Sequence, residues 1–203
     1  MHEAVGTRAD AVKLDAPGRR RSQNPDLLWR KVGLRTGETV VDVGAGTGFF
    51  SFPAAVRVGP KGRVYAVDVS SDLIDLLRER AELRKVENVE PVRSTPTHIP
   101  LDDALADVAI LANVLHGIPP ATVAETVRLL RPGGKLVDLD GKKQRTKGGP
   151  PGGGRLTPAE ATNVLTAYGL TRVDSFDFGP DHYVLVFERP LPPHHPGHLV
   201  SAE

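Results

Sequence analysis

The chain has 203 residues, with 26 Lys and Arg against 25 Asp and Glu, and it contains no cysteine. This length allows one domain with its own core, and the missing cysteine excludes disulfides, zinc–thiolate sites, iron–sulfur clusters and a cysteine nucleophile. A net charge of +1 disfavours a nucleic-acid partner. No apolar run is long enough to span a bilayer and no secretory signal is visible, so we expect a cytoplasmic protein.

Three segments differ in composition from the rest of the chain. Residues 1–23 are polar and end near the basic run Arg19–Arg21, which predicts a flexible arm. Residues 141–156 are rich in glycine, proline, lysine and arginine, and predict a flexible basic loop. Residues 190–203 are rich in proline and histidine and predict a disordered tail. One folded domain is therefore expected over residues 24–189.

Hydrophobic patterning within this domain predicts helices and strands that alternate along the chain. The predicted helices cover residues 25–32, 49–58, 71–86, 119–131 and 158–168. The predicted strands cover residues 38–44, 63–69, 89–93, 106–113, 135–139, 171–178 and 182–188. This alternation predicts an α/β fold with a single Rossmann-like, doubly wound sheet of seven mostly parallel strands. The last two strands form a C-terminal hairpin, which we expect to add an antiparallel edge strand.

A glycine-rich turn, Asp42-Val-Gly-Ala-Gly-Thr-Gly48, joins the first strand to the next helix. Such a turn lets backbone N–H groups approach a ligand at a helix N-terminus. Asp68 ends the second strand, where a carboxylate can accept hydrogen bonds from ribose hydroxyls. The dinucleotide fingerprint G-x-G-x-x-G would place its last glycine at position 49, which is Phe49. The turn therefore indicates a nucleoside ligand other than a dinucleotide.

Two further segments support one family. They are Leu111-Ala-Asn-Val-Leu-His116, at the end of the fourth strand, and Leu129-Leu-Arg-Pro-Gly-Gly-Lys-Leu136, before the fifth. With the glycine turn and the strand order, they make residues 26–189 resemble the class I S-adenosylmethionine-dependent methyltransferases. The resemblance is greatest to the branch with a methyltransferase type 11 domain that includes the ubiquinone/menaquinone C-methyltransferases.

This resemblance implies S-adenosyl-L-methionine as cofactor and S-adenosyl-L-homocysteine as product. It places the three glycines of the turn against the methionine part, Asp68 at the ribose, and Val69 and Leu73 beside the adenine. Thr95 could contact the adenine, although Pro96 after it has no N–H to donate. The implied cofactor-binding residues are Asp42, Gly44, Ala45, Gly46, Thr47, Gly48, Asp68, Val69, Leu73, Thr95 and Asn113.

Methyl transfer from a sulfonium is an in-line displacement, so the protein mainly orients the two reactants. A base is needed only if the acceptor must lose a proton. His116, which follows the fourth strand at the edge where such sheets bind ligands, is the catalytic candidate. It could instead be a loop histidine that packs on the cofactor or is simply exposed. His182 and Tyr183, at the start of the last strand, are further candidates.

The short chain shows no large insertion, which favours a small-molecule acceptor. In the branch that the chain resembles, arsenite methyltransferases use cysteine thiols, so the missing cysteine argues against arsenite methylation. Methyltransferases of base or glutamine nitrogens carry an Asn/Asp-Pro-Pro-aromatic motif after the fourth strand, and here Asn113 is followed by Val114-Leu115 instead. A methyltransferase acting on RNA or protein and a non-catalytic nucleoside-binding module remain alternatives. The oligomeric state is open, with a homodimer as one candidate.

The basic loop bears on the choice between these alternatives. It is either a mobile lid that recruits an anionic substrate or a solvated loop that charge keeps soluble. Its cations are Lys142, Lys143, Arg145, Lys147 and Arg155. The tail carries His194, His195 and His198, but no carboxylate cluster accompanies them, so no metal site is expected.

Overall fold

A computed structural model describes residues 6–143 and 154–192 of the chain. Most of the basic loop, residues 144–153, and the tail from residue 193 onward lie outside the described residues, as do Arg145, Lys147 and the three tail histidines. The predictions made for these residues therefore remain predictions.

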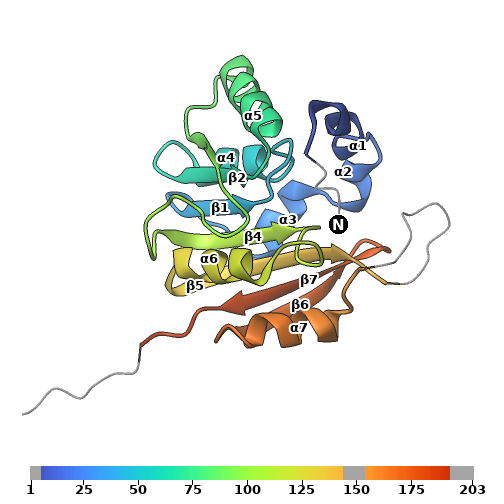
Figure 1. Cartoon of the computed structure of the whole chain (residues 1–203), viewed down its shortest axis with the longest axis vertical. Coiled ribbons are helices and arrows are strands. Elements are labelled where there is room, and N and C mark those ends of the chain that lie inside the picture. Colours follow the sequence, from blue (N-terminus) through green and yellow to red (C-terminus); the bar gives the residue numbers. More distant parts are fainter. Residues whose placement is uncertain (1–5, 144–153, 193–203) are drawn as a thin grey trace, which may run out of the picture.

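Seven strands form one sheet in the order β3-β2-β1-β4-β5-β7-β6, as Figure 1 shows between α5 and α7. The strands are β1 (Thr39–Val43), β2 (Arg63–Asp68), β3 (Val89–Arg93), β4 (Ala106–Ala112), β5 (Leu130–Gly141), β6 (Thr171–Phe178) and β7 (His182–Glu188). The first five pair in parallel, and β7 is antiparallel to both β5 and β6. The predicted Rossmann-like fold is confirmed. The antiparallel strand was wrongly expected at the edge, because β7 lies between β5 and β6.

Helices cover both faces of the sheet. They are α3 (Pro25–Lys31), α4 (Ser51–Val58), α5 (Ser71–Arg84), α6 (Pro120–Leu129) and α7 (Pro158–Thr166). One core cluster packs α3, α4 and α5 against the sheet, and a second packs α6 and α7 against the other face. Each cluster buries aliphatic side chains of the central strands. Packing on both faces therefore holds the ends of these strands in place.

Local capping explains where three helices begin. The side chains of Asn24, Ser70 and Thr157 accept hydrogen bonds from backbone N–H groups in the first turns of α3, α5 and α7. Proline occupies the first position of α3 and α7, where its missing N–H costs nothing.

The junction of α6 and β5 differs from the prediction. The helix ends at Leu129 and the strand begins at Leu130, so residues 132–134 lie within β5 rather than before it. The pairing with β4 is irregular here, since Leu130 aligns with Ala106 and Lys135 with Val108. The extra residues form a bulge, and a Cβ on Gly134 would lie 2.8 Å from a carbonyl oxygen.

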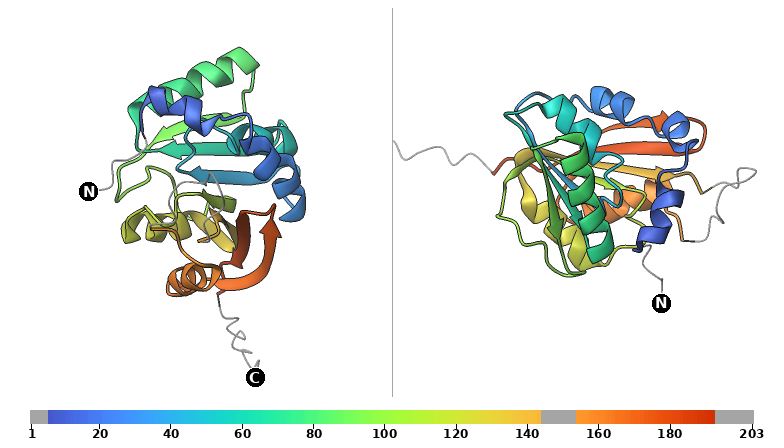
Figure 2. Two further views of the ribbon diagram at one scale, coloured as in Figure 1. Left: turned by 90° about the vertical axis from the view of Figure 1, so that its right-hand side faces the viewer. Right: turned by 90° about the horizontal axis from the view of Figure 1, so that it is seen from above.

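The N-terminal segment also differs from the expected flexible arm. Within residues 6–23 the chain forms a 3₁₀ turn (Arg8–Asp10) and two short helices, α1 (Ala11–Leu14) and α2 (Arg19–Ser22). Figure 2 shows these dark-blue turns beside α5. The segment lacks apolar periodicity, and ion pairs and polar contacts with the domain hold it in place. Among the described residues, no helix has the length and apolarity to cross a membrane.

Candidate functional site

The candidate site lies at the edge of the sheet where the parallel strands end. The carboxyl ends of β1, β2, β4 and β5 meet there, and β7 begins at the same edge because it runs in the opposite direction, with His182 paired to Gly141. Ligands of open α/β sheets bind at such an edge. The sequence-predicted residues of the glycine turn, Asp68, Asn113, His116 and His182 therefore share one edge.

The glycine turn after β1 requires its glycines. Gly44, Gly46 and Gly48 have φ values of +74°, +57° and +79°, in the left-handed region that favours glycine. A Cβ on Gly44 would lie 2.7 Å from Cγ1 of Val114, and one on Gly48 would lie 2.5 Å from Cε2 of Phe52. The turn is therefore a tightly packed strand-to-helix connection that no larger residue could form.

The N–H groups of this turn are bonded to β2. Those of Gly44 and Ala45 both donate to the carbonyl oxygen of Val67 at 2.9 Å, and that of Gly46 donates to Oδ2 of Asp68 at 2.9 Å. The expectation that these N–H groups face a ligand is therefore wrong for three positions. The turn offers close backbone approach instead of an anion cradle, which suits a ligand without phosphates at this point.

Asp68 is placed as the sequence predicts, at the end of β2 beside the turn. Its side chain also accepts from the N–H of Ser70 through Oδ1 at 3.0 Å, and burial raises its pKa. Each carboxylate oxygen accepts one backbone N–H and retains a further lone pair for a ribose hydroxyl. Val69 is 41% exposed whereas Leu73 is 1% exposed, so Val69 is the member of that pair that the structure leaves open to a ligand.

Asp42 lies beneath the turn, inside the domain. Its carboxylate accepts a hydrogen bond of 2.6 Å from the hydroxyl of Ser51, at the start of α4. Burial raises the pKa of Asp42 to about 6, and the Ser51 hydrogen bond and the Arg19 charge oppose this increase. Asp42 therefore joins β1 to α4 and does not face the open edge.

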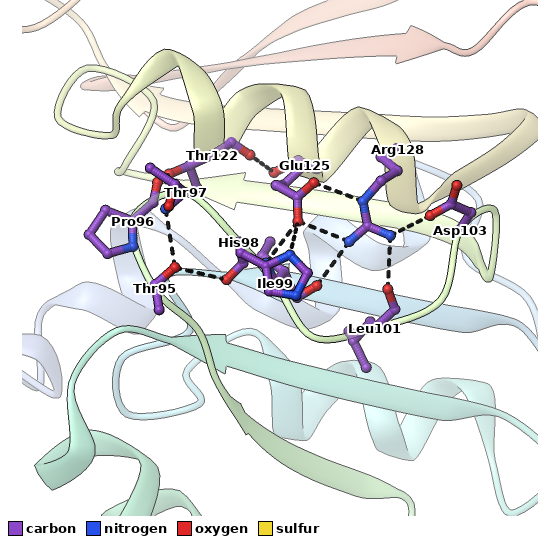
Figure 3. A network of polar contacts seen from close by, with 11 residues as sticks. Thr95, Pro96, Thr97, His98, Ile99, Leu101, Asp103, Thr122, Glu125 and Arg128 are labelled. Atoms are coloured by element: carbon purple, nitrogen blue, oxygen red, sulfur yellow. Dashed lines mark hydrogen bonds and ion pairs between the residues drawn. The ribbon is translucent and has the colours of Figure 1, made fainter.

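The segment after β3, which the sequence assigns to the adenine, is held by α6. Figure 3 shows Glu125 and Arg128 of α6 bonded to groups within residues 98–103, and Thr122 of the same helix bonded to Pro96. Glu125 accepts from the N–H of Ile99 at 2.9 Å, and Arg128 donates to the carbonyl oxygens of Ile99 and Leu101. The N–H of Thr95 donates to the carbonyl oxygen of His98. The hydroxyl of Thr95 is exposed and makes two long hydrogen bonds, of 3.4 Å each, with the carbonyl oxygen of His98 and the N–H of Thr97. It is the group of this segment that could contact an adenine.

The N-terminal segment covers the glycine turn. Asp15 accepts a hydrogen bond of 2.7 Å from the hydroxyl of Thr47 and forms a 2.6 Å ion pair with Arg80 of α5. Cδ1 of Leu14 would lie 3.4 Å from a Cβ on Gly46. Sequence reasoning missed this covering segment, because no hydrophobic pattern in the sequence indicates it.

Gln23 is a second residue that sequence reasoning missed. Its amide group exchanges two hydrogen bonds with that of Asn113, at 3.2 and 3.1 Å. Its nitrogen also lies 2.6 Å from Nε2 of His182, and its oxygen accepts from Nε of Arg19 at 3.1 Å. All donors and acceptors of this amide are therefore engaged, and it joins the N-terminal segment to the ends of β4 and β7.

His116 lies at the same edge and has a carboxylate partner. Its Nδ1 is 2.7 Å from Oδ2 of Asp140, and Oδ1 of this buried β5 residue accepts a hydrogen bond from the N–H of Gly141. This hydrogen bond raises the pKa of His116, against the opposing effects of burial and of the nearby Arg155. The His116 side chain is 30% exposed, so its second ring nitrogen can meet a ligand.

Two neighbours of Asp140 complete this part of the site. Asp138 lies on the same face of β5, fully buried, and within the described residues its carboxyl oxygens have no hydrogen-bond partner. Burial raises the pKa of Asp138 well above its usual value, which favours a protonated acid. The hydroxyl of Tyr183 donates to the carbonyl oxygen of Leu156 at 3.1 Å, and burial raises its pKa. Tyr183 therefore anchors a loop and is a poor proton donor or acceptor for a ligand.

The described part of the basic loop carries paired cations. Lys142 lies 2.9 Å from Asp177, and Lys143 lies 3.2 Å from Glu160. The guanidinium of Arg155 lies against Gly141, where a Cβ would be 2.5 Å from Nη1. No group of three or more potential metal ligands is found in residues 6–143 and 154–192.

This chain is similar to several known methyltransferases. A family described as "Methyltransferase domain" matches residues 40–134. Among curated relatives, an arsenite methyltransferase of Halobacterium salinarum is 39% identical over 109 residues, which are 53% of this chain and 28% of that protein. A demethylmenaquinone methyltransferase of Staphylococcus aureus is 32% identical over 120 residues, 56% of this chain and 49% of that protein. The chain thus spans half or less of the length of these two relatives.

A solved structure matches over almost its whole length. A SAM dependent methyltransferase from Aquifex aeolicus superimposes with a TM-score of 0.85 and 29% sequence identity, covering 89% of this chain and 97% of the other. The match therefore extends over most of this chain and nearly all of the other.

Proposed function

We propose that the chain is a class I S-adenosylmethionine-dependent methyltransferase of the type 11 kind and that it transfers a methyl group to a small-molecule acceptor. The match of residues 40–134 to a methyltransferase domain and the likeness to the Aquifex aeolicus structure support this assignment. The observation that carries this proposal is the pairing of the glycine turn with Asp68. Three left-handed glycines and a buried carboxylate lie side by side at the ends of β1 and β2. This arrangement fits a nucleoside whose ribose hydroxyls bind a carboxylate.

The residues present fit S-adenosyl-L-methionine. Asp68 would hold the ribose, the exposed Val69 and Thr95 would line the adenine side, and Asn113 would lie near the amino-acid end. When bound, this cofactor supplies a methyl group on a sulfonium and leaves as S-adenosyl-L-homocysteine. The chain's contribution is to hold the acceptor in line and to exclude water.

His116 is proposed as the base for an acceptor that must lose a proton. Since Asp140 only accepts hydrogen bonds when ionised, it fixes the proton of the neutral imidazole on Nδ1 and leaves a lone pair on Nε2. That nitrogen can take a proton from a hydroxyl or an acidic carbon. For an acceptor that needs no deprotonation, His116 would only help to shape the site.

A small molecule is preferred over RNA or protein as the methyl acceptor. Of the three arginines in the predicted basic arm, Arg19 faces inward and Arg20 pairs with Asp26 at 2.6 Å. Lys142 and Lys143 are likewise paired with carboxylates. Arg20, Lys142 and Lys143 are therefore paired with carboxylates of the chain, which weakens the electrostatic argument for a polyanionic partner.

A labelled-methyl transfer assay tests this proposal. The chain is incubated with methyl-labelled S-adenosylmethionine and with separated small-molecule, RNA and protein fractions of a cell extract. Label is expected in the small-molecule fraction, and it should disappear when Asp68 is replaced by alanine. Label found only in RNA or protein would contradict the proposed acceptor class, and binding without any transfer would favour a non-catalytic module.

A further inference from the structure

Arg19 of α2 points into the domain. Its Nε donates to Oε1 of Gln23 at 3.1 Å, and its Nη1 donates to the carbonyl oxygen of Leu14 at 2.7 Å. The centre of its guanidinium lies 4.2 Å from the centroid of the Phe49 ring and 5.6 Å from that of Phe50. These contacts fix the position of the guanidinium beside the start of α4.

The charge of Arg19 has no carboxylate partner within 4.0 Å among residues 6–143 and 154–192. The two carboxylates that favour its charged form are bonded elsewhere, Asp42 to Ser51 and Asp15 to Thr47 and Arg80. Burial outweighs both of them and lowers the pKa of Arg19. The protein thus holds a half-buried cation that an anion would stabilise.

The location of this cation indicates which anion it would meet. Phe49 directly follows Gly48, the last glycine of the turn. On the other side, Gln23 connects Arg19 to Asn113 after β4. The guanidinium therefore contacts the residue that follows the glycine turn and is linked to Asn113 through Gln23. Under the proposed function, both of these elements face the amino-acid end of the cofactor, which carries a carboxylate.

We propose that Arg19 binds the carboxylate of the cofactor's amino-acid portion, which makes the N-terminal segment part of the binding site. This inference rests on the proposed function. A guanidinium binds a carboxylate through paired N–H donors, and the stacking of Arg19 on Phe49 orients it before the ligand arrives. A purely structural Arg19 would only hold α2 against Phe49, and the two roles predict different ligand selectivity.

The test compares two ligands that differ in this carboxylate. S-adenosylhomocysteine carries the amino-acid portion, and 5′-methylthioadenosine lacks it. Calorimetry would measure the dissociation constants of both for the full chain and for the variants Arg19→Met, Arg19→Lys and Arg20→Met. Arg20 is the matched control, because it is adjacent, exposed and paired with Asp26.

We expect Arg19→Met to weaken S-adenosylhomocysteine binding about 10- to 100-fold, the range for a hydrogen bond to a charged group. Binding of 5′-methylthioadenosine should change less than about twofold, and Arg19→Lys should recover part of the loss because it keeps the charge. Arg20→Met should affect neither ligand.

Equal weakening of both ligands by Arg19→Met would overturn the inference and assign Arg19 a structural role. Unchanged binding of both ligands would overturn it as well. If the unaltered chain binds neither ligand, the proposed function fails and the inference fails with it. That outcome is distinguishable, because it does not depend on the variants.

Discussion

Oδ2 of Asp140 lies 2.7 Å from Nδ1 of His116, although 24 positions separate the two residues in the sequence. Asp140 is buried on β5, whereas His116 follows β4 and is partly exposed. The parallel pairing of these two strands brings a fixed carboxylate to a histidine at the ligand-binding edge. A carboxylate in this position both orients the ring and increases its basicity.

Replacing His116 tests its role as a base. For an acceptor that loses a proton, His116→Ala should lower kcat about 10²- to 10⁴-fold, the usual contribution of general base catalysis. Binding of S-adenosylhomocysteine should stay within about twofold, because His116 is assigned to the acceptor and not to the cofactor. Steady-state kinetics and calorimetry measure the two quantities. An unchanged kcat would leave His116 as a packing residue.

The pH profile of kcat/KM tests the partnership with Asp140. The hydrogen bond to Asp140 raises the pKa of His116 above its ordinary value of 6.5, and only the neutral ring can accept a proton. Activity should therefore rise with pH, with a midpoint above 6.5. Asp140→Asn removes the negative charge, so the midpoint should move to lower pH while the maximal rate falls. A midpoint that does not move would contradict the pairing as a catalytic unit.

Asp42 provides a test on stability. Its pKa is about 6 in the folded state against an ordinary value of 3.8, so folding favours the protonated acid. The stability that this group contributes is complete below pH 3.8 and is lost as the pH rises through 6. Asp42→Asn cannot ionise, yet its amide oxygen can still accept the Ser51 hydrogen bond.

The free energy of unfolding of Asp42→Asn, relative to that of the unaltered chain, should therefore increase with pH. The expected gain between pH 4 and pH 7 is about 2 kcal/mol, from the pKa difference. Urea unfolding at several pH values measures it. Unfolding free energies that remain parallel over this range would show that the Asp42 carboxylate is not destabilised by burial.

Glu125 gives the opposite sign of pH dependence. Its contacts with Arg128 and with the N–H of Ile99 hold its pKa at about 2, below the ordinary 4.5. Its contribution to stability is present above pH 4.5 and is lost as the pH falls through 2. Because solvent screens this pair, Glu125→Gln should cost only about 1 kcal/mol near neutral pH.

Glu82→Gln on the exposed side of α5 is a control for loss of charge alone. The difference between the unaltered chain and Glu125→Gln should shrink as the pH decreases from 5 toward 2. A cost for Glu125→Gln no greater than that for Glu82→Gln would show that the network in Figure 3 does not hold the segment after β3.

The sheet and the glycine turn could be predicted because their signals are local. Strand periodicity, caps such as Asn24 and the spacing of Gly44, Gly46 and Gly48 are each read within a few residues. The contacts of Gln23 with Asn113 and His182 join residues 90 and 159 positions apart. No short-range pattern encodes such contacts, so the sequence did not reveal this amide or the packing of the N-terminal segment.

The position of β7 and the bulge in β5 were not predicted, for a similar reason. The hairpin of β6 and β7 was predicted from its turn, but which strand pairs with β5 depends on tertiary packing. Likewise, Pro132-Gly133-Gly134 contains residues that usually end a helix, and sheet pairing extended β5 across them. Helix-breaking residues showed where α6 could not continue, but they could not show that a strand would begin there.

The central claim is that the glycine turn and Asp68 bind the nucleoside of the methyl donor. Calorimetric titration of the full chain with S-adenosylhomocysteine tests it directly, with Asp68→Ala as the site variant and Asp72→Ala, an exposed residue in the first turn of α5, as the control. Saturable one-to-one binding is predicted, weakened about 10-fold or more by Asp68→Ala and unchanged by Asp72→Ala. The account would be contradicted by no binding at millimolar ligand, or by equal binding to the unaltered chain and to Asp68→Ala.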